Sequence, residues 1–205
     1  MKTTFAFYLL HTLWVIRPPQ DYREEKISGQ LQQLEEMLAQ HEYQSVIDQG
    51  IRFQDRFEPS PAVAYEVALA ARLMGNVDLA FQYYDRVIEL DPQHAAARYD
   101  RGEIFLLTLG DVESAKADFR IAAEMVPEHW GVYYRLAHIA GYELDMQALE
   151  ANLDLAVAHG LDFQVLVQDP QWRQWAKHST IGPVLKMVFL RYTTESVWRE
   201  MERAP

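Results

Sequence analysis

Residues 75–92 read GNVDLAFQYYDRVIELDP, and residues 110–127 read GDVESAKADFRIAAEMVP. Matching residues recur at a constant offset of 35, including Gly75 with Gly110, Ala80 with Ala115, Tyr84 with Phe119 and Pro92 with Pro127. A fixed period of this length is typical of stacked helix pairs, in which each pair is too small to bury its own apolar face. The repeat therefore predicts an all-α solenoid, and it does not indicate what the protein binds.

The helical spacing of apolar residues continues on both sides of these two segments. It predicts a solenoid over 21–160 with helix pairs at about 24–58, 61–92, 95–127 and 130–159. Gly75 and Gly110 stand where the first helix of a pair ends and the chain needs a left-handed residue. One residue is inserted before Gly110, and in the fourth pair Leu144-Asp145 replaces the turn glycine. We expect the second and third pairs to be the most regular.

The pattern of small and aromatic residues in these pairs resembles the tetratricopeptide repeat family. The residues that carry the resemblance are Ala68, Gly75, Ala80, Tyr84, Val87 and Pro92 in the second pair, and Gly102, Gly110, Ala115, Phe119, Ala122 and Pro127 in the third. The resemblance implies a right-handed α-solenoid whose first helices line a concave groove. It also implies a protein-interaction function.

The segment from Gly160 to Val188 resembles the module that closes many arrays of this family. Asp169 is a good N-cap, and Pro170 suits the first position of a helix. We expect 161–205 to form capping helices, because the last repeat would otherwise expose its stacking face. Trp172 and Trp175 are expected to be core residues of this cap, and their alternative role is to contact a partner.

The charge is acidic and unevenly distributed. The formal net charge is −11, and residues 18–163 hold 11 Lys and Arg residues against 26 Asp and Glu residues. An acidic body repels phosphate backbones, so nucleic acid is not expected as a partner. The acidic surface is either a solvated helical surface or a means of attracting a basic protein segment.

The N-terminal segment, residues 1–20, contains the apolar-dominated run Phe5–Ile16 before Pro18-Pro19. Twelve residues are fewer than the ~20 that cross a bilayer, and no small-x-small cleavage site follows them. Three interpretations remain open: a docking helix, an uncleaved export or membrane-surface segment, and a removed signal. Association with a membrane, or between copies of the chain, would use Phe5, Leu9, Leu13 and Trp14.

The sequence carries no recognisable catalytic or metal-binding motif. There is no cysteine, so disulfides and thiolate metal sites are excluded. His41-Glu42 begins like a metalloprotease helix, but Ser45 stands where the second His is needed. No glycine-rich phosphate loop or Gly-x-Ser-x-Gly elbow is present. We expect a non-enzymatic protein with no cofactor and no metal.

The candidate binding residues lie on the first helices of the pairs. Tyr65, Tyr99 and Tyr134 occupy equivalent positions, and Leu69, Glu103 and His138 follow one turn later on the same face, with Tyr142 after His138. This face could offer a ladder of rings to an extended peptide or an inserted helix. The alternative is that the rings pack between neighbouring helices.

Recognition of an acidic chaperone tail is not expected, because the positions that carry Lys, Asn and Arg in such adaptors hold other residues here. Arg72, Arg98 and Arg101 are the nearby cations, and they do not follow that pattern. The sequence predicts a cytoplasmic adaptor that binds a peptide or helix of a partner protein, with a basic segment as one option. The alternative is a membrane-associated or exported structural or assembly subunit of a larger complex, held through residues 5–16.

Overall fold

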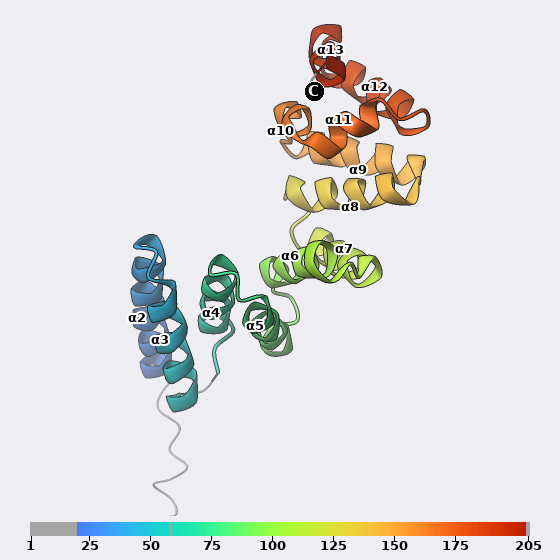
Figure 1. Ribbon diagram of the computed structural model, residues 1–205. Coiled ribbons are helices and arrows are strands. Elements are labelled where there is room, and N and C mark those ends of the chain that lie inside the picture. The colour runs from blue at the N-terminus through green and yellow to red at the C-terminus, as the bar shows by residue number, and fades with distance from the viewer. Residues whose placement is uncertain (1–19, 58, 204–205) are drawn as a thin grey trace, which may run out of the picture. The chain divides into compact units, whose positions relative to one another are not determined.

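The computed structural model describes residues 20–57 and 59–203, and these residues form helices joined by short turns (Figure 1). No strand occurs within these ranges. The helices are α2 (Gln20–Ala39), α3 (Tyr43–Arg56), α4 (Pro61–Leu73), α5 (Val77–Leu90), α6 (Ala95–Ile104), the π-helix η1 (Phe105–Leu109), α7 (Val112–Met125), α8 (Trp130–Glu143), α9 (Met146–Ala158), α10 (Phe163–Gln168), α11 (Pro170–Ala176), α12 (Ile181–Tyr192) and α13 (Glu195–Arg203). The expected all-α repeat fold is confirmed.

The chain divides into two compact units, with the boundary between Tyr83 and Tyr84. Unit 1 contains α2, α3, α4 and the start of α5, and unit 2 contains the remainder. The division does not fall at the predicted boundary between solenoid and cap near residue 160. The predicted N-terminal segment, with Phe5, Leu9, Leu13 and Trp14, lies outside the described residues apart from Gln20. Within the described ranges, no helix is both long and apolar enough to cross a membrane.

The turns between paired helices form as the sequence predicts. Gly75 and Gly110 have φ of 78° and 67°, the left-handed conformation that ends a first helix. Asp111 then caps α7 by accepting a hydrogen bond from the backbone N–H of Ser114 at 3.1 Å. Asp145 caps α9 in the same way through the N–H of Ala148 at 3.0 Å.

Small residues allow close helix contact in unit 2. A Cβ atom added to Gly102 of α6 would lie 2.8 Å from the ring of Phe119 on α7. Phe119, Ala115 and Ala122 of α7 are almost fully buried. A buried carboxylate adds a polar link, because Asp118 of α7 accepts hydrogen bonds from Arg101 at 2.7 Å and from Arg98 at 3.2 Å. The interface between α6 and α7 therefore has both an apolar centre and a satisfied charge at its edge.

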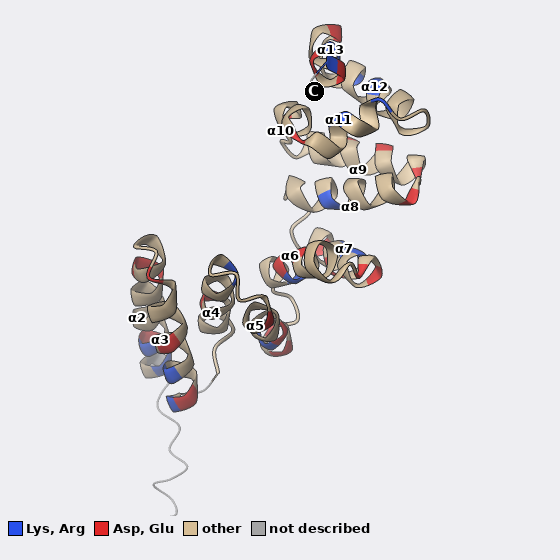
Figure 2. Cartoon of the chain, viewed as in Figure 1, with Lys and Arg blue, Asp and Glu red and all other residues tan. Residues whose placement is uncertain are grey.

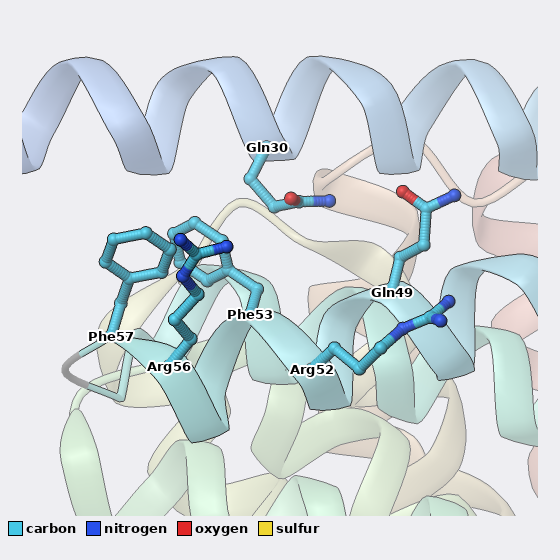
Figure 3. A pocket seen from close by; sticks show the side chains of 6 residues that line it. All are labelled: Gln30, Gln49, Arg52, Phe53, Arg56 and Phe57. Atoms are coloured by element: carbon cyan, nitrogen blue, oxygen red, sulfur yellow. The ribbon is translucent and has the colours of Figure 1, made fainter.

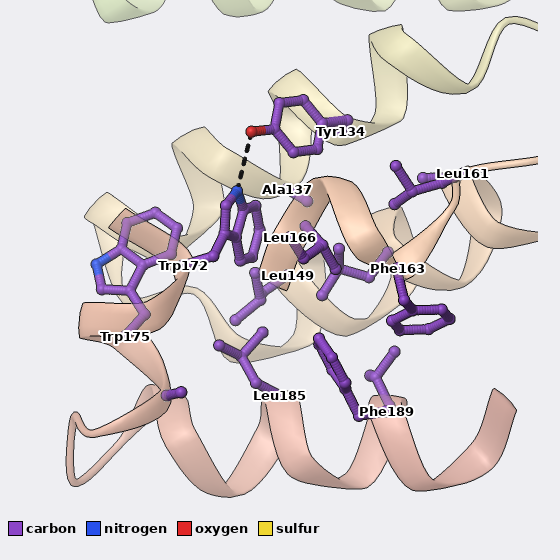
Figure 4. Close-up of a cluster of buried hydrophobic side chains, with 14 of the residues drawn as sticks. Tyr134, Ala137, Leu149, Leu161, Phe163, Leu166, Trp172, Trp175, Leu185 and Phe189 are labelled. Atoms are coloured by element: carbon purple, nitrogen blue, oxygen red, sulfur yellow. Dashed lines mark hydrogen bonds between the residues drawn. The ribbon is translucent and has the colours of Figure 1, made fainter. Parts of the chain in front are cut away.

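The C-terminal helices share one core with α8 and α9 (Figure 4). Trp172 is fully buried and Trp175 nearly so, which confirms them as core residues. Phe163 of α10 and Phe189 of α12 meet edge to face at 4.7 Å between ring centroids. The cap is thus part of the same hydrophobic core as the last helix pair.

Candidate functional site

The predicted binding residues are divided between the two units. Tyr65 and Leu69 lie on α4 in unit 1, and both are half-buried. Tyr99, Glu103, Tyr134, His138 and Tyr142 lie on α6 and α8 in unit 2.

Tyr134 lies inside the contact between α8 and the capping helix α11. Its side chain is 7% exposed, and its hydroxyl donates to Asp169 at 2.8 Å and accepts from the indole N–H of Trp172 at 3.1 Å (Figure 4). Burial, together with the hydrogen bond to Asp169, raises the pKa of Tyr134 to about 12. Of the two interpretations of this ring, the structure favours packing.

Tyr99 and Glu103 belong to a charged cluster between α6 and α8. Arg135 of α8 donates to a carboxylate oxygen of Glu103 at 2.6 Å. Burial and the nearby Glu103 carboxylate raise the pKa of Tyr99, whose ring also lies 5.5 Å from that of Phe119. Glu103 therefore has an internal cation as its partner.

The cations considered for a carboxylate site are also engaged within the fold. Arg101 bridges Asp118 and Asp85, with a nitrogen–oxygen distance of 2.6 Å to Asp85, and Arg98 pairs with Asp118. Both of these arginines are therefore paired with carboxylates of unit 2.

His138 and Tyr142 continue along α8 from Tyr134 to the surface. The His138 ring lies 5.1 Å from both Tyr142 and Trp175. Burial, and then the positive charge of Arg135, lower the pKa of His138 to about 4, so this ring is neutral at physiological pH. Tyr142 is 59% exposed, and its hydroxyl donates to Gln171 at 3.1 Å.

An apolar pocket of about 330 Å³ opens beside these two residues. It lies between η1, the start of α7 and the second half of α8, all in unit 2. The residues that line it are Leu106, Leu107, Val112, His138, Ile139 and Tyr142. The structure therefore brings two predicted site residues to one concave surface together with four aliphatic side chains.

The π-helix η1 forms one wall of this pocket, and the residue inserted before Gly110 accounts for it. The N–H of Asp111 donates to the carbonyl of Phe105 at 2.8 Å, which encloses a wider turn than an α-helix would. This wider turn leaves Leu107 62% exposed and Leu109 57% exposed. The sequence showed the insertion, but it did not show that the helix would absorb it.

A second concave surface lies in unit 1, between α2 and α3 (Figure 3). Its volume is also about 330 Å³, and Gln30, Gln49, Arg52, Phe53, Arg56 and Phe57 line it. The guanidinium of Arg56 lies 5.7 Å from the ring centroid of Phe57, and Arg52 donates to the carbonyl of Asp48 at 2.9 Å. Four of its six lining residues are glutamines or arginines, so this surface is more polar than the pocket in unit 2.

A metal site was not expected from the sequence. The described ranges contain no group of three or more His, Asp or Glu side chains placed to hold a metal ion.

Comparison with known proteins identifies the repeat. A model of the tetratricopeptide repeat family matches residues 62–94. Residues 62–94 of the chain therefore contain a tetratricopeptide repeat. The matched residues cover α4 and α5, where the sequence pattern is most regular.

Solved structures show that the tetratricopeptide-repeat fold extends beyond this segment. A MamA structure from Desulfovibrio magneticus RS-1 has a TM-score of 0.64 at 14% identity, and the similarity covers 86% of this chain and 97% of that one. TTC0263, a thermophilic tetratricopeptide-repeat protein of Thermus thermophilus, has a TM-score of 0.57 at 12% identity over 84% of this chain and 94% of that one. At such identities the likeness concerns the fold.

One curated relative is similar over a shorter region. The mouse protein described as FK506-binding protein-like is 40% identical over 63 residues, which is 31% of this chain. The match covers only 18% of the mouse protein.

Proposed function

We propose that this tetratricopeptide-repeat protein is a non-enzymatic scaffold that binds a polypeptide segment of a partner on the first-helix side of unit 2. The observation that carries the proposal is the apolar pocket beside Tyr142. Four aliphatic side chains line it, and an exposed aromatic ring stands at its edge. Concave apolar surfaces with a few polar groups are the usual places where proteins bind ligands.

The neighbouring residues narrow the area available to the partner. α11 already covers Tyr134, and Glu103 is paired with Arg135, whereas His138 and Tyr142 face the pocket. We therefore place the contact in unit 2 at the C-terminal half of α8. Tyr65 and Leu69 of unit 1, and Tyr99 of unit 2, stay as predicted contact residues.

Site-specific photocrosslinking tests the proposal. A photoreactive phenylalanine analogue would replace Tyr142 in one variant and Leu155, an exposed leucine of α9, in a matched control. We expect Tyr142 to give a defined polypeptide adduct in cells and Leu155 to give none. The proposal is wrong if neither position yields a polypeptide adduct, or if both yield the same set.

A second candidate function rests on the N-terminal sequence. The run Phe5–Ile16 is mostly apolar, and such a stretch seeks burial in a membrane surface or a protein. We propose as the alternative that it holds the protein to a membrane-bound complex, in which the repeats are a structural subunit. Deleting residues 1–17 should then release the protein from the membrane fraction, whereas a cytoplasmic scaffold would fractionate as soluble protein with or without them.

A further inference from the structure

Two exposed apolar residues line the pocket in unit 2, and a further one follows each of them closely in the chain. Leu107 and Leu109 belong to η1, Tyr142 ends the exposed face of α8, and Leu144 follows in the turn to α9. All four are more than half exposed. We refer to Leu107, Leu109, Tyr142 and Leu144 as the turn patch.

Two unfavourable backbone features occur at this patch. The π-helix η1 replaces the end of a regular helix, and such segments are frequent at functional sites. Leu144 adopts φ 56° and ψ 29°, the left-handed conformation that Gly75 and Gly110 adopt at the equivalent turns. A branched residue is rarely found in this conformation, and backbone strain of this kind is concentrated at functional sites.

Leu144 is also 53% exposed, so the leucine gains only part of the burial that a core position would provide. A glycine would satisfy the turn better, as it does in the other two pairs. The backbone does not account for a leucine at this position, and partial burial accounts for it only in part. Contact with a bound partner would account for it.

Acidic residues stand at the start of α7 and at the turn between α8 and α9 (Figure 2). Between residues 105 and 116, and between 138 and 145, the charged side chains are Asp111, Glu113, Glu143 and Asp145 against the single cation Lys116. Lys116 is already bound to Glu143. Hydrogen bonds from Ser114 lower the pKa of Asp111, which is therefore ionised at neutral pH.

We propose that the pocket and the turn patch bind a basic amphipathic helix of a partner protein, with one large apolar side chain in the pocket and Lys or Arg side chains facing the acidic rim. The inference rests on the proposed function and specifies its partner. Helices are recognised in grooves through apolar side chains three or four residues apart. The acidic rim selects a basic segment and repels an anionic lipid surface.

Fluorescence anisotropy with synthetic peptides tests the inference. The probe is a labelled peptide of about 14 residues, or roughly four helical turns, with leucines on one face and lysines on the other. Its controls are a glutamate version and a peptide of the same leucine and lysine content in shuffled order. We expect the basic amphipathic peptide to bind at least about tenfold more tightly than either control, and its affinity to fall with added salt.

Variants of the full chain then locate the binding site. Leu107→Asn and Leu144→Gly should each weaken binding of the probe by about tenfold, a change of about 1.4 kcal/mol. The matched control is Leu155→Asn, which changes an exposed leucine outside the patch. Urea unfolding of every variant shows whether a loss of binding reflects a loss of fold.

The charge of the rim is tested on a single helix. Glu113→Lys at the start of α7 should weaken binding severalfold and reduce its dependence on salt. Glu124→Lys near the end of the same helix makes an equal charge change away from the patch, so it should have a smaller effect. Equal effects of the two variants would show that the peptide senses only the net charge, and would overturn the inference.

The remaining outcomes identify a different occupant. Vesicles of equal parts phosphatidylglycerol and phosphatidylcholine test for a membrane. If the protein binds them and Leu144→Gly abolishes this binding, the patch contacts a membrane surface. A dimer that Leu144→Gly dissociates in analytical ultracentrifugation would indicate a second copy of the chain. Either result overturns the basic-helix inference. If Tyr142 crosslinks to a partner segment without basic residues, the inference fails while the proposed scaffold function stands.

Discussion

Substitutions of Leu144 measure how much folding stability the left-handed leucine costs at the turn patch. Replacing it by Ala removes a side chain that is about half covered and keeps the left-handed backbone. Because full burial of a leucine is worth about 1.5–3 kcal/mol, this change should cost about 1 kcal/mol. Replacing it by Gly loses the same contacts but removes the cost of about 1–2 kcal/mol that a non-glycine residue has in the left-handed conformation. The greater chain entropy of glycine in the unfolded state offsets about 0.5–1 kcal/mol of this gain.

The expected result is that Leu144→Gly is more stable than Leu144→Ala by about 0.5–1 kcal/mol. Urea unfolding followed by tryptophan fluorescence measures the difference, since Trp130, Trp172, Trp175 and Trp198 all lie in unit 2. The control is Leu155, an exposed leucine within α9. At this helical position the order should reverse, with Ala more stable than Gly by about 1 kcal/mol.

Equal stability of the Gly and Ala variants at position 144, or a more stable Ala variant, would refute a backbone cost at Leu144. The left-handed conformation would then carry no measurable cost, and the leucine would need no functional explanation. If Gly is the more stable of the two, both variants should still lose the peptide, because both lack the leucine side chain.

Three further predictions concern unit 2, and urea unfolding measures each. Tyr134→Phe leaves the buried indole N–H of Trp172 without its acceptor and should cost about 1–3 kcal/mol. Gly141→Ala should cost about 1–3 kcal/mol, because its Cβ would lie 2.5 Å from the Trp175 ring. The pKa of His138 is about 4 in the folded chain, below the value of about 6.5 in an unfolded chain. The neutral ring therefore contributes its full stability above about pH 6.5, and this contribution is lost as the pH falls toward about 4. Because the ring is partly exposed, we expect a loss of about 1–2 kcal/mol, and we expect no such loss in His138→Gln. If the stability of His138→Gln falls with pH as steeply as that of the wild type, His138 is not the group responsible.

The repeat pattern predicted the parts of the fold that depend on local spacing. Gly75 and Gly110 adopt the left-handed turns that their positions imply. Gly102 meets Phe119 as the small and large residues of the repeat suggest. Trp172 and Trp175 are buried, as expected for residues of a cap. Each of these features follows from a residue type at a fixed place in a helix pair.

The candidate site was less predictable because its contacts are not local. The sequence left open whether Tyr134 faces a groove or packs between helices, and only the folded chain shows Trp172, 38 positions away, bonded to its hydroxyl. The insertion before Gly110 was visible, but a turn or a helix could have absorbed it. The replacement of the turn glycine by Leu144 was the one available signal for the turn patch, and its exposure and backbone conformation give that signal its meaning.

The contact between α11 and α8 determines where the array can grow. An added helix pair after α9 would need the surface on which α10, α11 and α12 now rest, so it would displace Trp172 and the core around it. A duplicated pair inserted before α8 would leave this end intact. Changes in the length of the protein, by evolution or by design, are therefore expected upstream of α8, and a truncated chain that stops at residue 160 should be insoluble because it exposes the apolar surface that the cap covers.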